Sequence, residues 1–266
     1  MTEMLDLDAE VAADHLAGLT ARVAELAGDR VVRDVVDIGA GTGTGSFALL
    51  RRFPDATVTA IDTSAEMLSH LAGSARRHGF DGRVRTRQAD LDAGWPETGA
   101  ADLVWASASM HHMGDPDRVL ADIRGVLRPG GLFAMIEMES MPRFLPDDIG
   151  IGRPGLENRL NAIADHARAE HLPHVGSDWP SRLTAAGFTI LDAHDLVVDV
   201  PSPLPAAAVR YAAATFRRFR AGMTDRLPAD DLTTLDTLLA DDARLLRALP
   251  DLTVHSTRAV WIVTPT

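Results

Sequence analysis

Residues 35–46 read Val-Val-Asp-Ile-Gly-Ala-Gly-Thr-Gly-Thr-Gly-Ser, and this stretch decides the fold of the chain. Its first four residues form a short, mostly apolar run, which is typical of a central parallel strand covered on both faces. Glycines then stand at every second position from 39 to 45, where the backbone can turn sharply and a ligand can lie against it. Residues 46–53 have helical character and are followed by a proline. A strand, a glycine-rich turn and a helix start, in this order, predict a cofactor-binding corner.

The glycine turn leaves two classes of cofactor open. A dinucleotide-binding loop prefers the pattern G-x-G-x-x-G or A; Gly39 and Gly41 fit its first two positions, but Thr44 stands at the third. Asp62 ends the next apolar run, about 20 residues further on, where a ribose hydroxyl would be bound. Because NAD and S-adenosylmethionine can both use this geometry, the remaining motifs have to decide between them.

Length and composition narrow the class of protein. With 266 residues, 46% of them hydrophobic and 24% charged, the chain can form one large domain or one domain with a cap. The net charge of −12 repels phosphate backbones, so nucleic acid is a poor candidate substrate. The absence of cysteine excludes thiolate metal sites and thiol nucleophiles. The first residues do not resemble a signal peptide, and no run approaches the ~18 apolar residues of a membrane span, so we expect a cytoplasmic protein without a membrane partner.

Residues that can bind a ligand follow the next two predicted strands. Residues 84–88 predict a third strand, and Asp90 and Leu91 come shortly after it. Residues 101–106 predict a fourth strand, which is followed by Ser107 and then by Ala-Ser-Met-His-His-Met. Because the carboxyl ends of parallel strands meet in one crevice, we expect these segments and the glycine turn to lie close together.

These segments together make a recognisable pattern. The matching pieces are Val-Asp-Ile-Gly-Ala-Gly-Thr-Gly, Ile-Asp-Thr-Ser-Ala-Glu-Met-Leu, Gln-Ala-Asp-Leu, Met-His-His-Met-Gly-Asp-Pro and Leu-Arg-Pro-Gly-Gly. In this order they cover roughly residues 30–140, and the chain resembles the class I S-adenosylmethionine-dependent methyltransferases, within the broad group of small-molecule methyltransferases. The resemblance implies an α/β fold: a Rossmann-like, seven-stranded, mostly parallel sheet with helices on both faces and an antiparallel seventh strand.

The resemblance also implies which residues contact S-adenosylmethionine. The glycine loop would contact the methionine moiety and Asp62 the ribose hydroxyls, while Asp90 and Leu91 would contact the adenine. Asp37 would help to orient the amino group of the cofactor, and Ser107 would provide a backbone contact near the sulfonium. The expected cofactor contacts are Asp37, Gly39, Ala40, Gly41, Gly43, Asp62, Thr63, Met67, Asp90, Leu91 and Ser107.

Methyl transfer from a sulfonium needs neither a metal nor a covalent nucleophile. The enzyme has to hold the acceptor in line with the S–CH₃ bond, exclude water, and remove a proton if the acceptor is a hydroxyl or an acidic carbon. His111 and His112 follow the fourth strand, and a neutral imidazole is a suitable base near pH 7; we favour His111, with loop shaping as the alternative for both. Glu137, at the end of the predicted fifth strand, could bind a cationic or hydroxylated acceptor, or be exposed or paired with Arg143.

The rest of the chain is expected to cover the substrate. We predict a single methyltransferase domain over residues 1–266, with cover insertions at 141–180 and 201–250. The second insertion would be an α-helical cap between the sixth and seventh strands. Trp179 and Tyr211 lie in these insertions and could line an aromatic acceptor pocket, although core packing is equally expected of them.

Two further features have weaker interpretations. Residues 7–27 predict one amphipathic helix, which would either form a lid over the cofactor or cover only the edge of the sheet. A metal cluster could be formed by His166, Glu170, His171 and His174, but only His171 and His174 are close, Pro173 between them breaks helical geometry, and no aspartate completes a ligand set. We therefore expect no metal site.

The activity that the resemblance implies is transfer of the methyl group to an O, N or C atom of a small-molecule acceptor, by a monomer or a homodimer, with S-adenosylhomocysteine as product. A protein acceptor, a non-catalytic cofactor-binding protein and an NAD-linked oxidoreductase remain as alternatives. Base-amino methyltransferases usually carry an Asn/Asp-Pro-Pro-Tyr segment after the fourth strand. Here Ser-Ala-Ser-Met-His-His stands in its place, which agrees with the negative net charge in arguing against nucleic acid.

Overall fold

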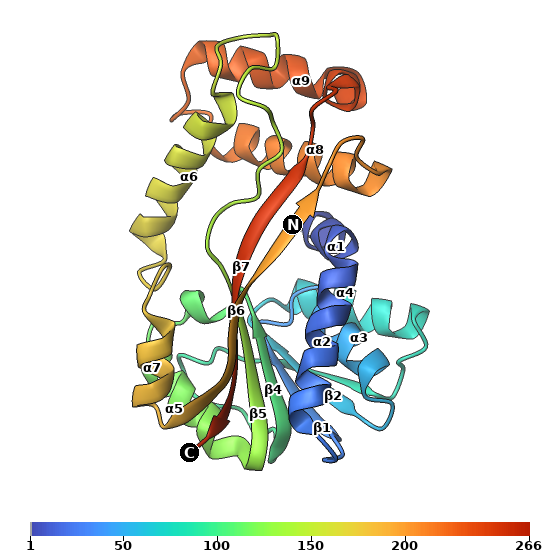
Figure 1. Cartoon of the computed structure of the whole chain (residues 1–266), viewed down its shortest axis with the longest axis vertical. Helices are drawn as coiled ribbons and strands as arrows, with labels where there is room; N and C mark the ends of the chain where they lie inside the picture. Colours follow the sequence, from blue (N-terminus) through green and yellow to red (C-terminus); the bar gives the residue numbers. More distant parts are fainter. Residues whose placement is uncertain (1) are drawn as a thin grey trace.

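The strand order of the central sheet shows how the chain is wound (Figure 1). The computed structural model describes residues 2–266, and within this range seven strands form one sheet in the order β3-β2-β1-β4-β5-β7-β6. Neighbours among β1 to β5 are parallel, whereas β7 runs antiparallel to both β5 and β6. The strands are β1 Asp34–Ile38, β2 Thr57–Asp62, β3 Val84–Gln88, β4 Ala101–Ser107, β5 Leu127–Met138, β6 Phe188–Val200 and β7 Val254–Pro265. The predicted α/β sheet with an antiparallel seventh strand is confirmed, and its order reverses between β1 and β4, where doubly wound sheets bind ligands.

Helices cover both faces of this sheet (Figure 1). The helical segments are α1 Thr2–Val11, α2 Ala13–Ala27, α3 Thr44–Arg52, α4 Ala65–Arg77, the 3₁₀ turn η1 Met110–His112, α5 Pro116–Val126, α6 Leu156–His171, α7 Trp179–Ala185, α8 Ala206–Gly222 and α9 Ala229–Ala248. On one face, α2, α3 and α4 share a buried apolar cluster with β1, β4 and β5. On the other face, α5 and α7 share a second cluster with the alternate residues of the same strands. None of the helices described for residues 2–266 combines the length and the apolarity that crossing a bilayer requires.

A helical cap with its own core lies beyond the end of the sheet. In Figure 1, β6 and β7 continue past the other strands as a two-stranded ribbon that leads to α8 and α9, and α6 passes beside them. Side chains from α6, α8 and α9 form a third apolar cluster, and Leu7 of α1 is buried in the same cluster. Helix α1 therefore packs with the cap, and α2 continues from it across the sheet face.

The turn after β1 has a shape that only glycine fits. Gly39 has a φ of +64°, and a Cβ on it would lie 2.5 Å from the Cβ of Ser109. The Ser109 hydroxyl donates a hydrogen bond to the Ile38 carbonyl at 2.9 Å, which holds the two chain segments at this separation. Gly43, at a φ of +89°, packs in the same way against Leu71 of α4. The loop is thus closed from both sides by neighbours that leave no room for a side chain.

Two predicted boundaries were wrong for identifiable reasons. The single helix expected over residues 7–27 is two helices, interrupted at Ala12. Leu7 faces the cap core while Leu19 faces the sheet, and one straight helix could not bury both. The fifth strand, which the sequence pattern predicts over residues 132–138, begins at Leu127, because Leu127 already pairs with Ala101 ahead of an irregularity in register.

The loop geometry predicts a difference between two glycine substitutions. Gly39→Ala should lower the free energy of unfolding by about 1–2 kcal/mol for the left-handed backbone, with a further loss of about 1–3 kcal/mol from the contact with Ser109. Gly79→Ala is the matched control, because Gly79 has a φ of +73° with open space around it and should show the backbone cost alone. Urea unfolding of both variants measures the difference; equal losses would show that Ser109 does not close the loop.

Candidate active site

A cavity of about 150 Å³ lies at the carboxyl ends of β1 and β4, beneath α1 and α2. Its floor is formed by the glycine loop, by Asp37 and by the last residues of β4. Its roof carries apolar side chains from α1 and α2, and one side is closed by β5, β6 and β7. The predicted cofactor residues that line it are Asp37, Gly39, Ala40, Gly41 and Ser107. The structure therefore brings the glycine loop after β1 and Ser107 at the end of β4 together around one cavity.

Asp37 gives the floor of the cavity a titratable group. Its side chain is almost fully buried and accepts a hydrogen bond from the Ser46 hydroxyl at 2.6 Å. Burial raises the pKa of Asp37 from its ordinary value to about 7, against the opposing effect of the Ser46 hydrogen bond. A positively charged ligand group beside Asp37 would favour the ionised carboxylate, so this position suits an ammonium group.

Asp62 ties the glycine loop to the end of β2. One carboxylate oxygen accepts the Gly41 N–H at 2.9 Å, and the other accepts the Ser64 N–H at 2.8 Å. Since a carboxylate has about four acceptor positions, Asp62 can still accept hydrogen bonds from hydroxyl groups of a ligand. The same residue thus shapes the loop and offers acceptors to a ribose.

The remaining predicted cofactor residues lie outside the cavity, toward the ends of β2 and β3. Thr63 is exposed, and Met67 lies in the first turns of α4. Asp90 is exposed and accepts the Asp92 N–H at 2.9 Å, whereas Leu91 is buried beside the second face of the sheet. These residues are separate from the cavity but continue the same edge of the sheet, so their predicted contacts with an adenosine stay predictions. Gly43, the last of the set, packs inside the loop and does not line the cavity.

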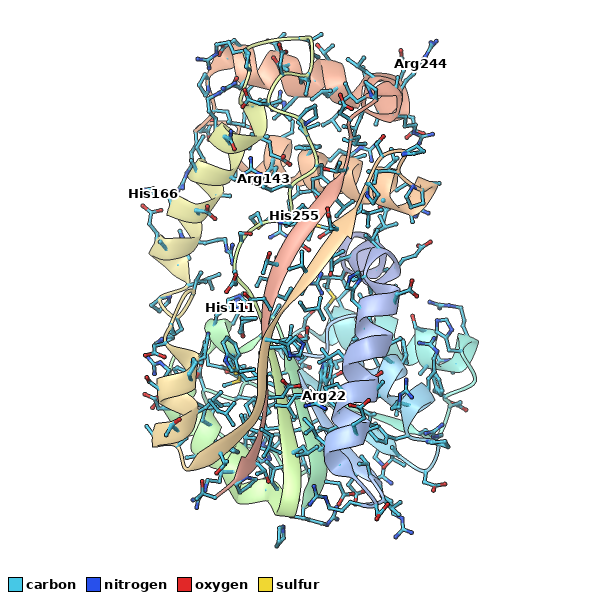
Figure 2. The ribbon with its side chains drawn as sticks, in the orientation of Figure 1. Arg22, His111, Arg143, His166, Arg244 and His255 are labelled. Carbon is cyan, nitrogen blue, oxygen red and sulfur yellow. The ribbon has the colours of Figure 1, made fainter. Side chains whose placement is uncertain are left out.

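His111 forms a buried pair with Glu137 on the opposite face of the sheet from the cavity. Glu137 accepts the Met110 and His111 N–H groups at 3.0 and 3.3 Å through one oxygen, and its other oxygen bonds His111 Nδ1. This arrangement fixes the ring and leaves Nε2 as the nitrogen that can exchange a proton. Figure 2 shows His111 at the level where the sheet meets the cap. Glu137 is buried and bonded to η1, so it is neither exposed nor paired with Arg143, and its predicted contact with an acceptor stays a prediction.

His112 lies next to this pair and is exposed. Its ring centroid is 4.3 Å from that of His111. Partial desolvation, together with the neighbouring His111, lowers the pKa of His112, so that its neutral form is favoured near pH 7. Neither histidine lines the cavity, so their catalytic roles stay predictions.

The two predicted aromatic acceptor contacts have different positions. Trp179 is 3% exposed and belongs to the core between α5, α7 and the sheet. It therefore packs in the core, which is the second of the two roles expected for it. Tyr211, on α8, donates a hydrogen bond from its hydroxyl to Asp8 at 2.8 Å. Asp8 lines the cavity, whereas Tyr211 lies behind Asp8 and does not itself line it.

No metal centre is found in the described part of the chain, residues 2–266, where no group of three or more His, Cys, Asp or Glu side chains is placed to hold an ion. His166 points outward from α6 in Figure 2 and lies 3.4 Å from Glu170 on the same helix. His171 Nδ1 bonds the carbonyl of Ala167 at 2.8 Å. These histidines are on or near the surface of the cap side and do not converge.

Several cavity residues were not identified from the sequence. Among residues 2–266, six buried side-chain N or O atoms lack a hydrogen-bond partner, and four of them belong to residues that line this cavity. They are His15 Nδ1, Thr42 Oγ1, Trp105 Nε1 and Arg258 Nε. Buried polar groups in proteins are usually hydrogen-bonded, so these four atoms are available to hydrogen-bond a ligand or water in the cavity. For these four residues the sequence offers one signal, which is the presence of a charged residue, Arg258, within the mostly apolar last strand.

Ala108 also lines the cavity and has strained backbone geometry. It follows β4 directly with a φ of +51°, and its N–H donates to the Ile136 carbonyl at 2.7 Å. Non-glycine residues rarely adopt a positive φ, and when they do they are often found at binding and catalytic sites. The strain sits at the point where β4 gives way to η1, between the cavity and His111.

Comparison with known proteins agrees with this geometry. Residues 35–131 match the family model described as a methyltransferase domain. A trans-aconitate 2-methyltransferase of Delftia acidovorans is 29% identical over 243 residues, which cover 85% of this chain and 87% of that protein. The corresponding enzyme of Azoarcus sp. is 39% identical over 109 residues, or 41% of this chain and 39% of that protein. The match thus spans about two fifths of that relative's length.

The fold itself is shared with solved structures. A putative methyltransferase from Bacillus halodurans superposes with a TM-score of 0.58 at 16% identity, covering 93% of this chain and 99% of that one. The methyltransferase-domain match over residues 35–131 and the similarity to a trans-aconitate 2-methyltransferase over 85% of the chain support a class I S-adenosylmethionine-dependent methyltransferase.

The buried Asp37 predicts a pH-dependent contribution to stability. Its folded pKa of about 7 lies above the ordinary value of 3.8. Between these two values the folded state binds more protons at this site than the unfolded state, so the contribution of Asp37 to the free energy of unfolding falls as pH rises and is lost above pH 7. Asp37→Asn removes this pH-dependent decrease in the free energy of unfolding. The free energy of unfolding of the variant, relative to that of the wild type, should therefore rise by a few kcal/mol from pH 4 to pH 7.

Urea unfolding at several pH values measures that difference. Asp55→Asn is the control, because Asp55 lies exposed in the turn before β2 and its loss should leave the pH profile unchanged. A constant difference between the Asp37 variant and the wild type across this range would mean that the Asp37 carboxyl is not desolvated in the folded protein.

Proposed function

We propose that this class I methyltransferase transfers a methyl group from S-adenosylmethionine to a small-molecule acceptor by in-line displacement. The observation that carries the proposal is the covered cavity at the β1 and β4 strand ends. It combines a glycine cradle, a buried carboxyl group and four unpaired polar atoms under an apolar roof. The cavity lies where the family places the reacting end of the cofactor, and its cover separates that end from water.

The residues around the cavity fit the cofactor. At Gly41 an added Cβ would lie 3.5 Å from Leu5 of α1, so α1 lies directly over this part of the loop. Asp37 offers a carboxylate to the ammonium group, and Asp62 offers acceptors to the ribose hydroxyls. The cofactor supplies a methyl group already activated on a positively charged sulfur. The protein residues therefore need to bind, orient and exclude water.

His111 and Glu137 are suited to remove a proton from an acceptor. Glu137 holds the imidazole through Nδ1 and two backbone N–H groups, so the free Nε2 is presented in a fixed orientation. A carboxylate that orients a histidine in this way also stabilises the positive charge that appears when the ring takes up a proton. Ala108, with its strained backbone, connects the cavity floor to η1.

The proposal includes a cytoplasmic location and a monomer or homodimer, as the sequence suggests. Transfer to a protein acceptor, a non-catalytic cofactor-binding role and NAD-linked oxidation are the outcomes that would replace it. Titration calorimetry with S-adenosylmethionine, S-adenosylhomocysteine and NAD separates them at the level of the cofactor. Binding of NAD without either sulfur compound would overturn the proposal. A screen of candidate acceptors with isotope-labelled cofactor, read by mass spectrometry, then identifies the methylated product.

Asp62→Ala should weaken the binding of S-adenosylhomocysteine by roughly ten- to a hundredfold. The substitution removes the charge-assisted hydrogen bonds to the ribose and also frees the Gly41 N–H of the loop. Calorimetry measures the change, with Asp55→Ala as the exposed control that should leave the affinity unchanged. An unaltered affinity in the Asp62 variant would remove the second strand end from the cofactor site.

His111→Ala should preserve S-adenosylhomocysteine binding and lower kcat by about 10²–10⁴-fold for an acceptor that must lose a proton. Glu137→Gln should have a smaller effect in the same direction and move the pH profile of kcat, because it weakens the hold on the imidazole without removing it. His166→Ala, on the outer surface of α6, is the control. Full activity in the His111 variant would assign the histidine to loop shaping.

A further inference from the structure

Arg258 stands at the rim of the cavity with part of its hydrogen-bonding capacity unused. Its Nη2 donates to both carboxylate oxygens of Asp8, at 2.6 and 2.7 Å. Its Nε is buried and has no partner among residues 2–266. A guanidinium binds a carboxylate best through two parallel N–H groups. In this structure Asp8 bonds a single nitrogen, and the Nε–H remains available.

The position of Arg258 in the sheet turns it toward the cavity. Its cross-strand neighbours are Met138 on β5 and Leu196 on β6, and directly paired residues point to the same face. Both neighbours line the cavity together with Arg258. The guanidinium therefore emerges from an apolar wall, and its side chain is 17% exposed.

Tyr211 adds a second donor at the same place. Its hydroxyl donates to the Asp8 oxygen that also receives Arg258, and the residue is 5% exposed. Burial and the negative charge of Asp8 raise the pKa of Tyr211, so the phenol remains protonated at any physiological pH. The Asp8 carboxylate on α1 is thus surrounded by a cation and a neutral donor that belong to β7 and α8.

The cavity is smaller than a typical small-molecule site while α1 remains where it is. Its volume of about 150 Å³ is below the range of about 300–1,000 Å³ that is usual for small-molecule sites. Leu5 and Asp8 of α1 both line it, so a displacement of α1 is the direct way to enlarge it, and that displacement carries Asp8 away from Arg258. A buried guanidinium that loses its partner is unfavourable unless another anion replaces it.

We infer that Arg258 and Tyr211 form a subsite for a carboxylate of the methyl acceptor, and that Asp8 occupies this subsite until the acceptor replaces it. The inference rests on the proposed methyl transfer and narrows its acceptor to an organic anion that carries a carboxylate. The positions of the other titratable groups that face the cavity agree with a carboxylate site at Arg258 that is separate from the site of the cofactor. Asp37 lies at the glycine-loop end, where a cofactor ammonium would be held, and the unpaired His15 Nδ1 of α2 is a further polar group in the roof.

Replacement of Asp8 tests the inference without requiring turnover. Asp8→Asn removes the internal anion, so a carboxylate ligand no longer competes with it. Succinate, fumarate and benzoate are titrated by calorimetry into protein saturated with S-adenosylhomocysteine, each beside its neutral methyl ester. At least one carboxylate should bind the variant about tenfold or more tightly than the wild type, and the esters should show no gain. The double variant with Arg258→Gln should lose this gain. Failure of all three acids to bind the Asp8 variant more tightly overturns the inference.

A second variant keeps the test valid if the Asp8 substitution perturbs folding. Tyr211→Phe keeps the ring in the cap core and removes only the hydroxyl. Carboxylate binding should weaken about three- to tenfold, while S-adenosylhomocysteine binding stays the same. Unchanged carboxylate affinity in this variant removes Tyr211 from the subsite. Arg220→Gln, which breaks an exposed ion pair with Asp236, is the control for loss of an arginine and should change neither affinity.

The cofactor's own carboxylate is the competing occupant. If Arg258→Gln weakens S-adenosylhomocysteine binding as strongly as Asp62→Ala, Arg258 holds the methionine carboxylate and the inference is overturned. Failure of the proposed function gives a different result, because S-adenosylhomocysteine then does not bind the wild type at all. In that case the same titrations of Asp8→Asn without S-adenosylhomocysteine still decide whether Arg258 binds carboxylates.

Discussion

The turn after β1 is the constraint on which the rest of the site depends. The backbone reverses at Gly39 within contact distance of Ser109, so the end of β1 and the segment after β4 are locked side by side. Asp62 then fixes the position of the Gly41 N–H from β2. Three strand ends are therefore held together by one loop, and a side chain at its first glycine would push them apart. The cavity exists because this loop takes up so little space.

Helix α1 connects the loop to the cap. Leu7 is buried in the cap core, Leu5 lies against the glycine loop, and Asp8 bonds both Arg258 and Tyr211. A helix of ten residues thus contacts each part of the molecule that borders the cavity. The cap has its own apolar cluster, separate from the two that flank the sheet.

The polar groups of the site are distributed over the two faces of the sheet. Alternation along β5 and β7 sends Met138 and Arg258 toward the cavity and Glu137 toward η1. The face beneath α1 and α2 therefore holds the groups proposed to bind ligands, and the opposite face holds the histidine proposed for proton transfer. The strained Ala108 lies where the chain passes from one to the other. This arrangement keeps the His111–Glu137 pair dry and ordered while leaving the cavity free for ligands.

The sequence by itself determined the order of strands and helices, the glycine turn and the positions of Asp37 and Asp62, because each depends on residues close together in the chain. Apolar periodicity and glycine spacing are local signals, and they predicted the parallel strands and the cofactor-binding turn, whereas the antiparallel last strand was implied by the resemblance to the methyltransferases. The tertiary structure alone decided that residues 7–27 bend at Ala12, and that Glu137 supports His111. It also brought Asp8 to Arg258, across 250 positions of the chain. Such contacts depend on how separate elements pack, and no short-range pattern records which buried donors will be left without a partner.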